Sequence, residues 1–314
     1  MKKRKITILI CMFIVASTFL LEAGKKYTVD FYVNATTPLK LEVPPGWPSP
    51  SSNIFANNPL TEEGFQLGRK LFYDGRLSKD GNFACASCHQ QFAAFSTYDH
   101  DLSHGFHDHF TTRNALPLFN LAWKKLYHWD GGVNHIEVQA LSPMTAPNEM
   151  AENIDSVLLK LKKDTAYIRL FKSAFGSSLI NSQRMLKAIA QFVGSMVSAD
   201  SKYDKVKRGE DSFNNAEAHG YELFKAHCAN CHKEPLFTDE SYRNNGLALN
   251  DYLKDYGRMR ITGDPADSLK FIVPSLRNVS VTYPYMHDGR LYSLYKVVDH
   301  YRKGIVVIST LDSS

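Results

Sequence analysis

The sequence of 314 residues contains only five cysteines, and none of them is left over for a disulfide. Cys11 lies in an apolar stretch near the N-terminus, and the other four fall in two copies of the pattern C-x-x-C-H. Small exported domains usually depend on disulfides for stability. A disulfide framework is therefore excluded as the feature that organises this chain.

The sequence also lacks a strong charge of one sign and long stretches of alternating hydrophobicity. Residues 1–24 carry four of the 37 Lys and Arg and one of the 32 Asp and Glu, which leaves 33 basic and 31 acidic residues. This balance gives no electrostatic support for binding nucleic acid. Without runs that alternate between apolar and polar residues, the sequence predicts a mostly α fold.

The N-terminal stretch is typical of an exported protein. Four basic residues at positions 2–5 precede the apolar run 6–21, and this order predicts a signal peptide over residues 1–24 and a periplasmic protein. An uncleaved membrane anchor is the alternative. The proline-rich residues 25–60 predict an extended arm rather than a helix.

Two pentapeptides carry the chemistry of the sequence, Cys85-Ala86-Ser87-Cys88-His89 and Cys228-Ala229-Asn230-Cys231-His232. Two thiols three positions apart on a helical turn can each form a thioether with a vinyl group of one haem, and the following His can bind its iron. A zinc site or a redox dithiol is the alternative. A zinc site would need ligands from distant parts of the chain, and a dithiol has no use for the His. The pattern therefore predicts two covalently bound haems c.

The surroundings of the two pentapeptides are similar, which predicts two cytochrome-c-like domains with one haem each. A helix is expected after Thr61, helical spacing returns at about 151–175, and the strongest apolar repeat covers 182–198. The segment Gly220-Tyr221-Glu222-Leu223-Phe224 repeats the pattern of Gly68-Arg69-Lys70-Leu71-Phe72. We expect a peroxidatic haem domain over residues 61–200 and an electron-transfer haem domain over residues 201–314.

From about residue 40 onward the sequence resembles the bacterial di-haem cytochrome c peroxidases, a family that includes the maturation enzyme of methylamine dehydrogenase. The segments that carry the resemblance are Gly68-Arg69-Lys70-Leu71-Phe72-Tyr73-Asp74, Arg113-Asn114-Ala115, Trp129-Asp130-Gly131, Gln139-Ala140-Leu141-Ser142-Pro143, Pro147-Asn148-Glu149-Met150, Pro274-Ser275-Leu276-Arg277-Asn278 and Tyr283-Pro284-Tyr285-Met286-His287-Asp288-Gly289. The resemblance implies reduction of hydrogen peroxide to water at the first haem. Electrons would come from a small cytochrome c or cupredoxin through the second haem. The family normally continues with a further helix, so a truncated C-terminal domain is expected, and a homodimer is left open.

The resemblance also implies roles for particular residues. Glu149 matches the acid–base group that moves a proton between the two peroxide oxygens. Gln139 and Pro143 match the distal pocket of the first haem, and Trp129 matches the aromatic residue between the haems. The calcium ion of the family matches the positions Asn114, Thr282 and Pro284, whose oxygen atoms suit a hard cation.

The sixth ligands of the two irons are left open. For the second haem, the resemblance favours Tyr301 over Met286, because the ligand of the family lies fourteen residues after the His of His-Asp-Gly. For the first haem, His104 lies near the place of a removable ligand, and His107 and His109 are alternatives.

Tyr at the second haem is typical of the maturation-type enzymes, whereas Met is typical of the peroxidases. Three functions follow as hypotheses. The first is a peroxidase, the second is an oxidase of protein or small-molecule substrates acting through high-valent iron, and the third is a non-enzymatic di-haem electron carrier.

Overall fold

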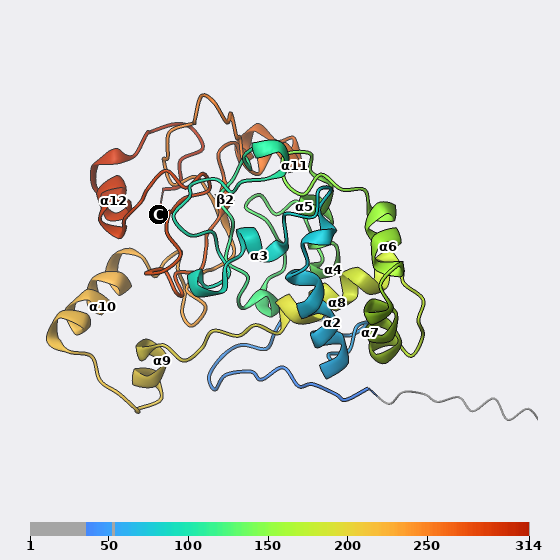
Figure 1. Cartoon of the computed structure of the whole chain (residues 1–314). Helices are drawn as coiled ribbons and strands as arrows, with labels where there is room; N and C mark the ends of the chain where they lie inside the picture. The colour runs from blue at the N-terminus through green and yellow to red at the C-terminus, as the bar shows by residue number, and fades with distance from the viewer. Residues whose placement is uncertain (1–35, 52–53, 314) are drawn as a thin grey trace, which may run out of the picture. The chain divides into compact units, whose positions relative to one another are not determined.

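The computed structural model describes residues 36–51 and 54–313, and its elements are labelled in Figure 1. The predicted signal peptide and residues 25–35 of the predicted arm lie outside the described residues. The first part of the chain contains α2 (Glu62–Phe72), η1 (Gly75–Leu77), α3 (Cys85–Cys88), η2 (Gln91–Ala93), η3 (Phe106–Asp108), η4 (Leu121–Trp123), α4 (Ile136–Gln139), α5 (Leu141–Thr145), α6 (Ile154–Lys162), α7 (Thr165–Phe175) and α8 (Ser182–Gly194). The remainder contains α9 (Lys202–Lys207), α10 (Asn215–His227), β1 (Tyr242–Arg243), α11 (Met259–Thr262), η5 (Pro265–Asp267), β2 (Phe271–Ile272), α12 (Leu294–Asp299) and the π-helical turn η6 (His300–Gly304).

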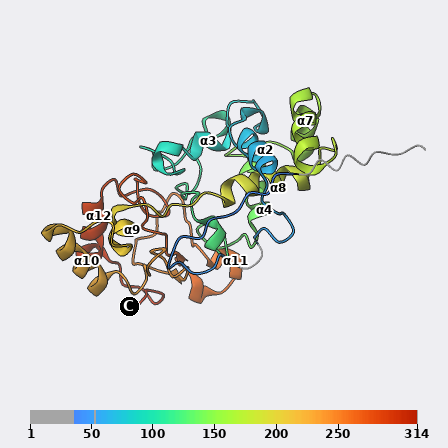
Figure 2. The same ribbon diagram turned by 90° about the horizontal axis from the view of Figure 1, so that it is seen from below.

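Helices α2 and α8 pack against each other at the centre of the hydrophobic core, and they lie side by side in Figures 1 and 2. The hydroxyl of Thr61 accepts a hydrogen bond from Gly64 N–H at 3.1 Å and so caps the start of α2. Gly68 allows the two helices to approach, since a Cβ there would lie 1.9 Å from the Ala188 carbonyl oxygen. The core adds residues from α6 and α7; its buried members include Leu67, Leu71, Phe72, Val157, Leu161, Phe171, Met185, Ile189 and Phe192. Each such side chain stabilises the fold by roughly 1.5–3 kcal/mol.

The C-terminal part of the described chain has a different interior. Beyond residue 200, the buried hydrophobic residues among those described are Ile272 and Val273. Neither α10 nor α12 contains a buried residue, although helices of globular proteins normally bury one apolar face. Residues of β1, β2 and α12 instead line a cavity.

The small sheet and the proline-rich arm connect parts of the chain that are far apart in sequence. Strands β1 and β2 are antiparallel, with Tyr242 opposite Ile272. Trp47 of the arm lies over the Arg277 guanidinium at 4.5 Å and packs edge-on against Trp123 at 5.1 Å. The arm thus contacts residues on both sides of the predicted domain boundary at residue 200, which stays a prediction.

Helices make up nearly all the regular structure, and the one named sheet among the described residues has two strands. The prediction of a mostly α fold is confirmed in this respect. The expected helix at about 151–175 is two helices, α6 and α7, separated where the Asp164 carboxylate caps α7. Within the described ranges no helix has both the length and the apolar character needed to cross a bilayer.

Candidate haem sites and the groups between them

The first pentapeptide forms one helical turn, α3, which presents Cys85 and Cys88 on one side. The N–H of His89 donates to the Cys85 carbonyl at 2.9 Å and closes this turn. Burial and the neighbouring Cys88 raise the pKa of the Cys85 thiol to about 12. The two thiols and the following His thus lie within one turn of chain, which is the arrangement that a covalently bound haem requires.

The imidazole of His89 has the tautomer and the charge that a metal ligand requires. Its Nδ1 lies 2.9 Å from the Phe95 carbonyl oxygen, which can only accept, so Nδ1 carries the proton and Nε2 has a free lone pair. Burial lowers the pKa of His89 to about 4. The ring is therefore neutral at neutral pH, which is the form that binds a metal.

The second pentapeptide repeats this arrangement at the end of α10. The N–H of His232 donates to the Cys228 carbonyl at 2.9 Å. Its Nδ1 lies 3.1 Å from the carbonyl oxygens of both Phe237 and Pro274. Burial again lowers the pKa of the imidazole. The two predicted proximal histidines thus share one tautomer.

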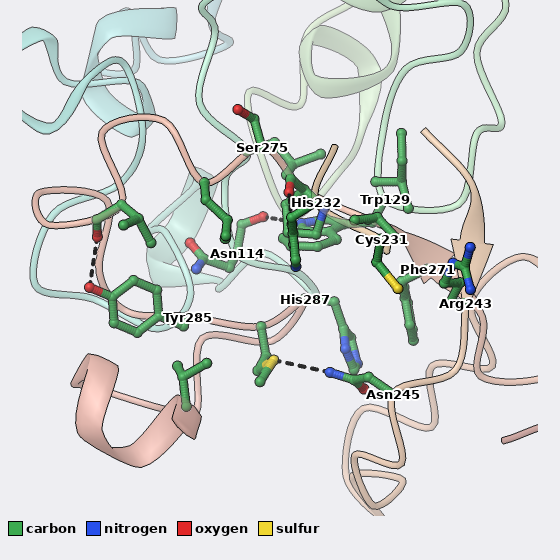
Figure 3. Close-up of a pocket in the computed structure, with 18 of the residues that line it drawn as sticks. Asn114, Trp129, Cys231, His232, Arg243, Asn245, Phe271, Ser275, Tyr285 and His287 are labelled. Atoms are coloured by element: carbon green, nitrogen blue, oxygen red, sulfur yellow. Dashed lines mark hydrogen bonds between the residues drawn. The ribbon is translucent and has the colours of Figure 1, made fainter. Parts of the chain in front are cut away.

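A cavity adjoins His232 and fits a large planar group (Figure 3). It contains about 1360 Å³ of space between atoms, part of it open to solvent. Its wall is largely apolar and includes Leu116, Trp129, Phe271, Ile272, Val273, Leu276, Val279, Leu294, Val297 and Ile305, while Cys231 and His232 lie on the same wall. A haem here would supply the apolar interior that α12 lacks. The residues present therefore fit the group.

Both predicted ligands of the second iron line this cavity. Tyr301 comes from η6, and Met286 comes from the loop that joins β2 to α12. The Tyr301 hydroxyl and the Met286 sulfur each lie 3.4 Å from the side-chain nitrogen of Asn245. The structure brings the two candidates to one place and leaves the choice between them a prediction.

Glu149, the predicted acid–base residue, lies near the first pentapeptide. Burial raises the pKa of the Cys88 thiol, and the nearby Glu149 carboxylate adds to the effect. Burial also raises the pKa of Glu149 itself. The backbone carbonyl of Glu149 accepts the Phe106 N–H at 2.7 Å. This bond joins the loop of Glu149 to the histidine-rich loop, residues 104–109.

Gln139 and Pro143, the residues predicted for the distal pocket, lie on the two short helices that precede the Glu149 loop. Gln139 ends α4, and Pro143 lies within α5, where its carbonyl accepts the Met150 N–H at 3.1 Å. His128 is close by, since a hydrogen bond to the Gln139 backbone partly offsets the lowering of its pKa by burial. His128 was not among the residues predicted from the sequence. The one pattern that points to it is its position directly before Trp129.

The histidine-rich loop is exposed. His104 packs against Phe110 with ring centroids 4.6 Å apart and against His100 at 5.4 Å. His107 and His109 are also exposed. The role of His104 as a ligand of the first iron stays a prediction.

Trp129 is buried and lies on the wall of the cavity beside His232. Its Nε1–H donates to the Asn114 carbonyl at 2.8 Å, and its own carbonyl accepts the Ile272 N–H at 2.8 Å. The next residue, Asp130, binds Arg113, which also holds Asp255. Trp129 is thus fixed by residues from both predicted domains.

The positions predicted to hold calcium lie together beside the cavity. The side-chain nitrogen of Asn114 donates to the Pro284 carbonyl at 2.5 Å, and Thr282 lines the same wall. The Asn114 side-chain oxygen is buried without a hydrogen-bond partner among the described residues. A buried oxygen without a donor suits a hard cation. The described residues contain no group of three His, Cys, Asp or Glu side chains placed to hold a metal, so such a site depends on amide and carbonyl oxygens.

Residues 62–212 match a family described as di-haem cytochrome c peroxidase. Over 253 residues the chain is 39% identical to the methylamine utilization protein MauG of Methylorubrum extorquens, an alignment that covers 79% of this chain and 70% of that protein. It is 35% identical over 264 residues to the cytochrome c551 peroxidase of Nitrosomonas europaea, covering 80% and 76%. The chain belongs to the di-haem cytochrome c peroxidase family.

Solved structures agree with this assignment. A MauG-like protein associated with microbial copper homeostasis matches with a TM-score of 0.78 and 32% identity, covering 88% of this chain and 86% of that one. The di-haem peroxidase BthA of Burkholderia thailandensis matches with a TM-score of 0.69 at 22% identity, covering 78% and 72%, and shows the fold alone. The resemblance stated from the sequence is confirmed. The protein is an oxidoreductase of the di-haem peroxidase type, and the family implies haem c as its cofactor.

Proposed function

We propose that this protein reduces hydrogen peroxide to water at a haem held by Cys85, Cys88 and His89. The single observation that carries the proposal is the position of Glu149, which is partly buried near that pentapeptide, where burial raises the pKa of its carboxyl group. Haem c, when bound, supplies an iron that binds peroxide and exchanges electrons. The remaining chemistry belongs to the side chains of the chain.

Glu149 handles the proton in this proposal. Cleavage of the peroxide bond requires that the proton on the inner oxygen move to the outer oxygen, so that water can leave. A carboxylate can accept and return that proton within one site, and a raised pKa makes it a better base. Two electrons and two further protons complete the conversion of one peroxide into two waters. Gln139 and Pro143 shape the space in which this occurs.

The second haem, on Cys228, Cys231 and His232, receives electrons from a small cytochrome c or cupredoxin in this proposal. Trp129 lies on the wall of that cavity and is fixed to Asn114 and Ile272. In this proposal Trp129 passes electrons toward the first haem. We further propose calcium at Asn114, Thr282 and Pro284 and a periplasmic location, the latter from the N-terminal pattern.

A second candidate is oxidation of a protein or small-molecule substrate, as in the maturation-type enzymes. The observation that favours it is Tyr301 in the cavity beside His232, because an anionic oxygen ligand stabilises ferric iron more than a thioether does. The 39% sequence identity to MauG of Methylorubrum extorquens supports this candidate as well. A non-enzymatic carrier is disfavoured, because the family and its named peroxidases are enzymes.

Steady-state turnover of peroxide with a reduced small cytochrome c tests the proposal. Glu149→Gln should lower kcat/KM for peroxide about 100-fold or more, within the usual range for loss of a general acid–base group. Glu137→Gln, the same chemical change in the first turn of α4, serves as the control and should retain turnover. Near-normal turnover of Glu149→Gln would contradict the role of Glu149. If the wild-type protein turns over no peroxide with such a donor but oxidises protein side chains when peroxide is added, the second candidate replaces the first.

A further inference from the structure

The two side chains that compete for the second iron share one hydrogen-bonding partner. The Asn245 side-chain nitrogen lies 3.4 Å from the Met286 sulfur and 3.4 Å from the Tyr301 hydroxyl oxygen. Figure 3 shows the contact with the sulfur as a dashed line, with Asn245 below the space that His232 and Cys231 border from above. An amide NH2 group has two N–H donors and can serve both contacts at once.

The orientation of this amide is fixed by its own surroundings. The Asn245 side-chain oxygen accepts the Leu247 N–H at 3.3 Å, which directs the NH2 group toward the cavity. The backbone carbonyl of Asn245 is bonded to His300 Nε2 at 3.0 Å. The adjacent Gly246 N–H donates to the Asn244 side chain at 2.9 Å. The donor is therefore held in place before any ligand binds.

The elements that carry the two candidates are held differently. Tyr301 follows His300 directly, so the bond from His300 to Asn245 fixes the start of η6 beside the amide. Met286 has a left-handed backbone, with φ of 75°. This conformation is unfavourable for a residue with a Cβ, and the Met286 side chain reaches the cavity from it.

We propose that Asn245 is a positioning residue that selects Tyr301 over Met286 as the sixth ligand at the second haem. This inference rests on the proposed haem at His232 and deepens it. A hydrogen bond to an anionic oxygen is about twice as strong as a neutral one, whereas a thioether sulfur is a weak acceptor. The same amide therefore favours Tyr301 as the ligand, because its bond to the oxygen strengthens when the oxygen becomes anionic, whereas its bond to the sulfur stays weak.

The test is the near-infrared spectrum of the purified ferric protein, in which a thioether ligand gives a weak band that a tyrosine ligand does not give. The wild-type protein should lack this band, and Met286→Leu should leave its spectrum unchanged. Asn245→Leu, which removes the donor at similar volume, should make the thioether band appear, because loss of the hydrogen bond removes the preference for Tyr301. The midpoint potential of the second haem should rise with it.

Two further variants keep the proposal open to contradiction. Asn245→Asp retains the acceptor for Leu247 N–H but lacks the NH2 donor, so it should show the same band if Asn245→Leu fails to fold. In Asn245→Leu/Met286→Leu the band should disappear, because no sulfur remains near the iron. A thioether band in the wild type, no new band in either Asn245 variant, or a band that persists in the double variant would each overturn the proposal.

The haem content separates this inference from the function on which it rests. A protein with one haem per chain would contradict the proposed second haem. A protein with two haems whose ligation and potential do not respond to Asn245 would contradict the selector role alone, and the effect of Glu149→Gln on peroxide turnover is independent of both.

Discussion

Arg113 holds both carboxylate oxygens of Asp255, which lies 142 residues later in the chain, at distances of 2.6 and 2.9 Å. Its third nitrogen binds Asp130 at 2.6 Å, and its guanidinium lies 5.8 Å from the centre of the Phe271 ring. The Asp255 side chain is 2% exposed and that of Arg113 16%. One guanidinium thus joins the segment around Trp129 to the part of the chain that lines the cavity beside His232.

Replacing Asp255 with Asn should destabilise the protein by about 3 kcal/mol. Removing one partner of a buried ion pair usually costs roughly 3–5 kcal/mol because a buried charge loses its counterion. The lower end of this energy range is expected, because Asp130 still binds Arg113 in the variant. The free energy of unfolding from urea titration measures the effect. Asp251→Asn, at an exposed position nearby, should change it by less than about 0.5 kcal/mol, and a similar loss in both variants would contradict the prediction.

The buried pair of Asp204 and Arg277 should make stability depend on acid pH. Burial by itself raises the pKa of Asp204, but hydrogen bonds from Arg277 and Ser201 outweigh it and lower the pKa to about 2. The unfolded chain has the ordinary value of about 3.9. Because the folded pKa is the lower one, this contribution is fully present above about pH 4 and is lost as the pH falls toward about 2.

Urea titrations between pH 5 and pH 2 should therefore show a falling free energy of unfolding. In Asp204→Asn the slope over the window from about pH 4 to about pH 2 should be shallower, whatever the absolute stability of the variant. Equal slopes in the two proteins would show that Asp204 does not titrate differently on folding.

Local patterns in the sequence predict the helices well. Thr61 and the acidic residues after it predict the start of α2, and the apolar repeat of 182–198 predicts α8. The strands β1 and β2 are missed, because two residues each cannot show alternation. Asp164 marks the break between α6 and α7, because Asp often caps the start of a helix. The apolar repeat of 151–175 conceals this signal.

The functional residues are predictable to different degrees. The pentapeptides predict both proximal histidines, because the chemistry lies within one turn of chain. The nearness of Glu149 to Cys88 comes only from the family resemblance, since no local spacing encodes it. The sequence does not predict a role for Asn245, because its side chain gains its partners only where η6 and the Met286 loop meet.

Gly105→Ala should lower peroxide turnover while leaving most of the fold intact. A Cβ at Gly105 would lie 2.2 Å from the Asn148 carbonyl oxygen and 2.8 Å from the Glu149 Cα, so the two loops must separate. The shift breaks the bond between Phe106 and Glu149 and moves the proposed acid–base group. A displacement of about 1 Å can cost about 100-fold in rate. Gly220→Ala, in α10 with open space at its Cβ, is the control and should keep full turnover; equal activity of the two variants would contradict the steric argument.

The peroxide reaction should lose activity on the acid side at a pH above the ordinary pKa of a Glu side chain. Burial disfavours the ionised form of Glu149 and raises its pKa above 4.5. Below that raised pKa the carboxyl group already carries a proton and cannot accept one from peroxide. A plot of kcat/KM for peroxide against pH should therefore rise through a single ionisation above pH 4.5.

In Glu149→Gln the remaining turnover should not show this ionisation, since an amide does not titrate. An acid limb that keeps its midpoint in the variant would assign the ionisation to another group and remove Glu149 from the proton transfer.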